Sequence, residues 1–135
     1  MAAAMKATFK VEVAGASTMS AVYTLQAEAF DRIDVTVPAE ASGTPGSVTV
    51  EVQPGGAGQV ALLFITSASF PHASDGSPEL TYDVDGGGDR SLDGPLLLAG
   101  PGSVELLGAV NQIVFSNASD TDLAVHILVG RDATS

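Results

Sequence analysis

The stretch SVTVEV at residues 47–52 places a valine at every second position, with serine, threonine and glutamate between them. The stretch TFKVEV at residues 8–13 follows the same rule, with one phenylalanine and two valines alternating with polar or charged residues. Successive side chains of a β-strand point to opposite faces, so a period of two indicates a strand with one buried face and one face in water. The rhythm continues through much of the chain and predicts a protein built from sheets.

The chain has 135 residues and no cysteine. This length is sufficient for one domain with a hydrophobic core that needs neither disulfides nor a structural metal. The glycine-rich stretches are too short to act as linkers, so we expect a single β-sandwich domain over residues 1–135. Without thiols, the chain can form no disulfide framework and no zinc-thiolate site.

Clusters of glycine, proline, serine and aspartate, such as ASGTPG at 41–46 and DGGGD at 85–89, interrupt the apolar rhythm. No segment has a convincing helical period, and residues 103–110 can form one short turn at most. Regularly spaced short strands predict an all-β fold, an antiparallel β-sandwich of about nine strands with jelly-roll or Greek-key connections; the alternative is a closed β-barrel. The expected strands are residues 7–14, 20–28, 31–38, 46–53, 58–67, 79–85, 95–99, 110–116 and 122–130.

The apolar parity of each expected strand predicts the core. If Phe64 is part of that core, its replacement by alanine should destabilise the protein by about 3–5 kcal/mol. The predicted core residues are Phe9, Val11, Val13, Tyr23, Leu25, Ile33, Val35, Val37, Val50, Leu62, Phe64, Leu80, Tyr82, Val84, Val114, Val125, Ile127 and Val129.

Two strands carry apolar residues on both parities. The run Val60–Ile65 is apolar throughout, and the last strand repeats the pattern more weakly over residues 123–129. Both faces of such strands must be covered, either by loops of the same subunit or by another molecule. If another molecule covers these strands, the residues of the second parity form an interface between copies. The expected interface residues are Ala61, Leu63, Ile65, His126 and Leu128.

The densest polar cluster is Asp83, Asp85, Asp89 and Asp93 around the glycine run 86–88. Several carboxylates on a flexible loop are the ligands that a calcium ion needs. The spacing departs from the EF-hand pattern, in which glycine would not occupy the positions of two ligands. The alternative is a hairpin turn with its carboxylates in water. Calcium is therefore a secondary expectation, and no other cofactor is indicated.

Charge and motifs exclude several functions. Five Lys and Arg against sixteen Asp and Glu give a net charge of −11, which disfavours nucleic acid and anionic membranes as partners. The chain has no Gly-x-Ser-x-Gly elbow, no phosphate-binding loop and no histidine with a carboxylate nearby in sequence. The absence of tryptophan weighs against a sugar-binding surface. We expect no enzymatic activity.

The remaining hypothesis is a non-enzymatic structural protein that self-associates, as a trimer or larger ring, and coats or docks on a larger particle such as a virion. The alternative is a calcium-dependent ligand- or carbohydrate-binding module. The start MAAAMK lacks the basic segment and long apolar stretch of a secretory signal, and the longest apolar run is too short to span a membrane. We therefore expect a cytoplasmic or particle-associated protein.

Overall fold

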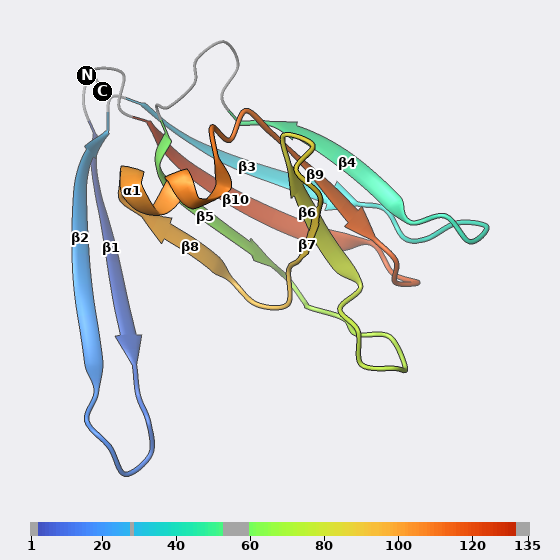
Figure 1. Cartoon of the computed structure of the whole chain (residues 1–135), viewed down its shortest axis with the longest axis horizontal. Helices are drawn as coiled ribbons and strands as arrows, with labels where there is room; N and C mark the ends of the chain where they lie inside the picture. Colours follow the sequence, from blue (N-terminus) through green and yellow to red (C-terminus); the bar gives the residue numbers. More distant parts are fainter. Residues whose placement is uncertain (1–2, 28, 53–59, 132–135) are drawn as a thin grey trace.

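The computed structural model describes residues 3–27, 29–52 and 60–131. These residues form an antiparallel β-sandwich with one additional hairpin (Figure 1). The strands are β1 (Ala3–Val11), β2 (Met19–Ala27), β3 (Ala29–Val37), β4 (Gly46–Glu51), β5 (Val60–Ser67), β6 (Leu80–Val84), β7 (Asp89–Ser91), β8 (Leu96–Ala99), β9 (Gln112–Asn117) and β10 (Leu123–Arg131). A short helix α1 (Pro101–Val104) and a 3-10 turn η1 (Glu105–Leu107) lie between β8 and β9.

The sandwich has jelly-roll topology. One sheet has the order β3-β10-β5-β8 and the other β4-β9-β6-β7. Counted from β3, the eight strands therefore alternate between the sheets, except at the hairpin that joins β6 to β7. This is the strand order of two interlocked Greek keys, so the prediction of a jelly-roll sandwich is confirmed and the barrel alternative is not formed.

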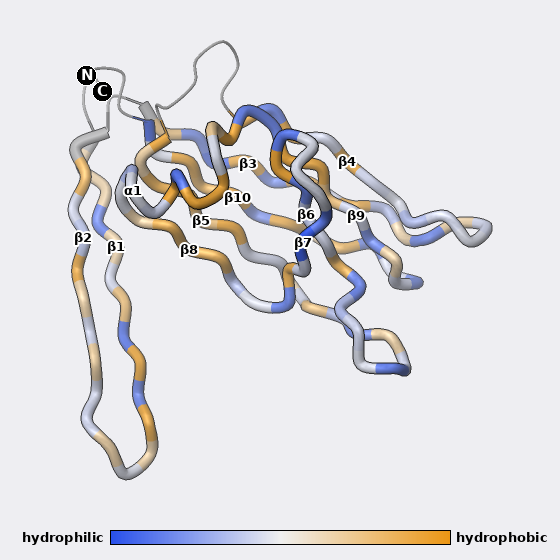
Figure 2. Tube along the Cα trace, in the orientation of Figure 1, coloured by the Kyte–Doolittle hydropathy of each residue, from blue (hydrophilic) through white to orange (hydrophobic). Residues whose placement is uncertain are grey.

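The core lies between the inner faces of the two sheets, where the period-two alternation places every second side chain. Phe115, Leu63 and Ile65 are among its largest fully buried side chains. Other members are Val37, Val50, Leu80, Tyr82, Val84, Ile113, Val125, Ile127 and Val129. Figure 2 shows apolar residues concentrated along β5 and β8.

The hairpin of β1 and β2 stands apart from the sandwich, and its tip extends beyond the sheets (Figure 1). Among the described residues, its base contacts the sandwich at Gly130 and Gly100. A Cβ added at Gly130 would lie 2.8 Å from Met5 Sδ and 3.1 Å from Leu25 Cδ2, so glycine allows the hairpin to approach β10 closely. Tyr23 lies against Gly100 at the end of β8.

The position of this hairpin corrects part of the predicted core. Val11 and Val13 are 61% and 58% exposed, because the hairpin leaves the sandwich instead of entering it. Phe9 is half-buried. In β9 the buried parity is Ile113 and Phe115, so Val114 lies on the outer face and the prediction that it is a core residue is wrong.

Within residues 3–27, 29–52 and 60–131, no helix is long and apolar enough to cross a membrane.

Candidate functional site

The outer face of the β3-β10-β5-β8 sheet carries the main candidate site. Here the ladder register sets Leu128 beside Phe64 and Phe64 beside Leu97, in a row across three strands. Phe30, at the start of β3, adds an aromatic ring that is 54% exposed. Aliphatic and aromatic side chains that meet on a sheet surface need a cover to exclude water, and an apolar patch of this kind is typical of an interaction site.

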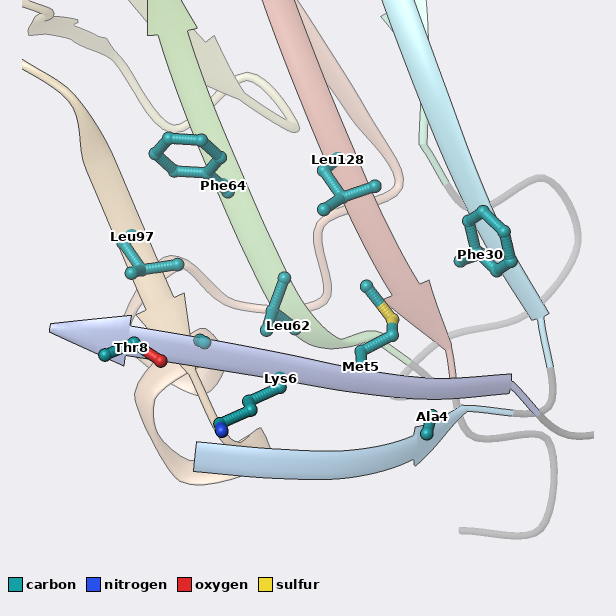
Figure 3. A pocket seen from close by; sticks show the side chains of 10 residues that line it. Ala4, Met5, Lys6, Thr8, Phe30, Leu62, Phe64, Leu97 and Leu128 are labelled. Carbon is teal, nitrogen blue, oxygen red and sulfur yellow. The ribbon is translucent and has the colours of Figure 1, made fainter. Parts of the chain in front are cut away.

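These side chains form the floor of a groove of about 460 Å³. One wall is β1, which contributes five consecutive residues, 4–8 (Figure 3). Side chains of both parities line the groove, so it runs along the edge of the strand. We call this cavity the outer-face groove; its floor consists of Phe30, Leu62, Phe64, Leu97 and Leu128.

A second hollow of about 290 Å³ continues the groove along the same face and shares Phe64 and Leu128 with it. Its lining adds Arg32, Thr66, His126 and Ile127. The site therefore extends from the hairpin to Arg32 on β3 and His126 on β10.

The end of the site on β3 and β10 carries a cross-strand hydrogen bond between a histidine and a carboxylate. His126 and Asp34 lie directly opposite each other on β10 and β3, and His126 Nδ1 is 2.7 Å from Asp34 Oδ1. Arg32 Nε approaches the same carboxylate oxygen at 3.5 Å. The hydrogen bond from His126, supported by the Arg32 charge, lowers the pKa of Asp34 below its ordinary value. The Asp34 carboxylate therefore stays ionised to a lower pH than an isolated aspartate.

The proximity of His126 and Asp34 could not be predicted from the sequence. Asp34 and His126 are separated by 92 residues, and their proximity depends on the pairing of the first and last strands of the sandwich. His126 and Leu128, two of the five expected interface residues, are half-buried on the outer face of β10.

The other three expected interface residues are elsewhere. Leu63 and Ile65 are fully buried between the sheets, and Ala61 is only 2% exposed, so the prediction that they form an outer surface is wrong. The opposite parity of β5, Leu62 and Phe64, faces outward. Leu62 pairs with Gly130, which lies under the hairpin base, and the hairpin therefore buries the Leu62 side chain.

The four aspartates of the proposed calcium loop do not converge. Asp85 accepts hydrogen bonds from the backbone N–H groups of Asn111 and Gln112 at 2.9–3.1 Å, and this ties the β6–β7 turn to β9. Asp83 faces Asp89 across the β6–β7 pair and accepts a bond from the Gly88 N–H. Within the part of the chain that the structure describes, no group of three or more carboxylates or histidines is arranged to hold a metal ion.

The outer face of the second sheet contrasts with the site. Its strands present Ser47, Thr49, Glu51, Thr81, Asp83, Gln112, Val114 and Ser116. All but Val114 are polar or charged, which is the composition of a surface that stays in water. The two sides of the sandwich therefore differ in chemistry.

Comparison with known protein families, with curated proteins and with solved structures finds no significant match.

Proposed function

We propose that this protein is a non-enzymatic structural subunit that self-associates and attaches to a larger particle. Its binding surface is the outer face of β3-β10-β5-β8 together with the β1–β2 hairpin. The observation that carries the proposal is the apolar surface left uncovered on this side: Phe30 in the groove and Val11 and Met19 on the hairpin are 54–76% exposed. Exposed apolar side chains gathered on one side of a molecule mark an interaction surface.

The contrast between the two sheets supports the choice of side. A subunit that coats a particle needs one adhesive side and one side that remains hydrated. The Ser, Thr and acidic residues of β4, β6 and β9 suit the hydrated side, whereas the leucines and phenylalanines of β5, β8 and β10 suit the adhesive side.

The fold is compatible with this role but does not select it. Jelly rolls serve as viral capsid subunits, as lectins and as cupins, so the topology alone carries little functional information. The proposed association with a virion or similar particle therefore depends on the surface chemistry. The net charge of −11 favours a protein partner over nucleic acid or an anionic membrane.

Light scattering coupled to size-exclusion chromatography of the full chain tests self-association. We expect a discrete mass several times that of the 13.5 kDa chain at micromolar concentration. Electron microscopy of the native source material, with the chain labelled by a specific antibody, should show the label on regular particles. A monomer in solution combined with diffuse label would contradict the proposal.

A further inference from the structure

We propose that the distal half of the hairpin of one copy occupies the outer-face groove of a second copy. This inference rests on the proposed function and names the partner: another copy of the same chain. The segment that docks is the distal hairpin face, defined as Phe9, Val11, Met19 and Ala21.

The distal hairpin face is apolar by register. Phe9 pairs with Ala21 and Val11 pairs with Met19, and these residues share the parity of Met5 and Leu25 at the base. At the base, β10 covers this face at Gly130. Val11 and Met19 lie farther along the hairpin, beyond the sandwich, and are 61% and 76% exposed. A two-stranded hairpin whose apolar face is exposed to water is only marginally stable in isolation. Contact with another apolar surface would therefore stabilise the distal part.

The outer-face groove offers a matching cover. Its floor is formed by aliphatic and aromatic side chains, and its wall is the edge of β1, which within the described residues is paired only with β2. An incoming strand can therefore place apolar side chains on the floor while its backbone hydrogen-bonds to the free edge of β1 (Figure 3). An extended strand with alternating apolar side chains fits both requirements, and the distal hairpin supplies one.

Charge favours the hairpin as the part of a second copy that docks. The hairpin strands and their turn, residues 3–27, carry both lysines of the chain, Lys6 and Lys10, against the single carboxylate of Glu12. Residues 29–135 carry three arginines against fourteen carboxylates, a net charge of −11. Lys10 Nζ and Glu12 Oε1 are 2.8 Å apart, and Lys6 lines the groove itself, so the docking segment carries no net charge. Two sandwiches therefore repel each other, whereas the distal hairpin of one copy meets no such repulsion from the sandwich of the next.

The contact joins two different surfaces, because the hairpin of each copy enters the groove of the next. A heterologous contact of this kind closes into a ring, or forms an open filament if the rotation does not close. Each copy then has its own hairpin inserted and its own groove filled, so that both apolar surfaces are covered throughout the assembly.

The lack of cysteine allows a direct test by disulfide trapping between two single-cysteine variants of the full chain. Val11→Cys places a thiol on the distal hairpin face, and Leu97→Cys places one in the groove. After mixing and mild oxidation, we expect a disulfide-linked dimer of one copy of each variant on non-reducing gels. Val22→Cys is the matched control, because Val22 is 60% exposed on the opposite face of the same hairpin. It should give little cross-linking with Leu97→Cys.

The second measurement compares Val11→Asp with Val22→Asp by light scattering. Both valines are about equally exposed and neither lies in the core cluster, so both variants should keep the wild-type circular dichroism spectrum. We expect Val11→Asp to shift the protein to a monomer and Val22→Asp to retain the wild-type mass.

The outcomes separate the two proposals. If wild type is an oligomer but Val11→Asp keeps its mass, or if Val11→Cys cross-links only to itself, the hairpin-in-groove contact is wrong while self-association stands. The same holds if Val22→Asp dissociates the protein as fully as Val11→Asp. If wild type is monomeric, self-association is wrong and the hairpin-in-groove contact is wrong with it.

Discussion

At the scale of single residues, Asn117 shows how a polar side chain can hold the sandwich together. It is fully buried at the end of β9, and its Nδ2 donates hydrogen bonds to the carbonyl oxygens of Val37 and Thr121 at 3.2 and 2.8 Å. Its Oδ1 accepts bonds from the N–H and hydroxyl of Ser119. Asn117-Ala118-Ser119 matches a glycosylation acceptor pattern, but the buried amide has a structural role.

Replacing Asn117 with alanine should therefore lower the free energy of unfolding by about 2–3 kcal/mol, because buried carbonyl and hydroxyl groups lose their partners. Urea denaturation followed by circular dichroism measures this loss. Ser116→Ala, on the outer face of the same strand, is the control and should change stability by less than about 0.5 kcal/mol. Equal effects of the two substitutions would contradict the structural role of Asn117.

Asp34 is the residue for which the structure predicts a pH effect. Its pKa is lowered in the folded protein, by the hydrogen bond from His126 and then by Arg32, from an ordinary value of 3.8. A carboxylate with a lowered folded pKa contributes stability above its unfolded pKa and loses that contribution as the pH falls through the folded pKa. The stabilisation is thus present at pH values above 3.8 and disappears in stronger acid.

Asp34→Asn should accordingly be less stable than wild type near neutral pH, and the difference in melting temperature should shrink as the solution is acidified below pH 3.8. Because both side chains are substantially exposed, the effect should be small. Asp93→Asn provides a comparison at an exposed carboxylate that is not bonded to His126. A constant difference between Asp34→Asn and wild type across the acid range would disprove the linkage.

At the scale of elements, β5 packs apolar residues on both of its faces. Leu63 is fully buried in the core, whereas Phe64 is half-buried in the outer-face groove. Leu63→Ala should cost about 2–5 kcal/mol in the free energy of unfolding. Phe64→Ala should cost distinctly less despite removing the larger side chain. Parallel denaturation curves of the two variants test this order, and the reverse order would place Phe64 in the core after all.

The sequence predicted the strands well because most of them have one face in water, which produces the alternation of apolar and polar residues. Each of the nine expected ranges overlaps an observed strand, but Asp89–Ser91 was missed because all three of its residues are hydrophilic and exposed. For Val60–Ile65 the period of two is absent, so the pattern could not reveal which parity faces inward. The inward and outward residues of β5 were interchanged for this reason.

The candidate site was less predictable than the strands. Alternation in β1 correctly indicates an apolar face, but it cannot tell whether that face meets the core or projects from the molecule, as Val11 does. The pairing of His126 with Asp34 and the assembly of the groove from β1, β3, β5, β8 and β10 are consequences of strand order. Strand order depends on contacts between distant segments, which local patterns do not encode.

At the scale of the whole molecule, we expect the sandwich to fold without the hairpin. Among the described residues, no member of β1 or β2 belongs to the core cluster, and the hairpin contacts at Gly100 and Gly130 lie outside it. Deletion of residues 1–28 should leave a cooperatively unfolding β protein that is destabilised by about 1–3 kcal/mol, since Leu62 loses its cover. It should also be monomeric, as the proposed assembly requires the hairpin.

Circular dichroism, thermal unfolding and light scattering of the deleted chain check these expectations against the full chain. Loss of the cooperative transition would show that the sandwich depends on the hairpin for folding. Retention of the wild-type subunit number would show that other surfaces drive association.

In the proposed assembly, the hydrophilic outer face of β4, β9 and β6 would also limit growth. A shell made from this subunit, with the outer face of β3-β10-β5-β8 turned toward the underlying surface, would present serines, threonines and carboxylates outward. A second tier of subunits would meet a negatively charged, hydrated boundary with little apolar area on which to pack. The coat would therefore stop at a thickness of one molecule, and coated particles would repel each other and stay dispersed.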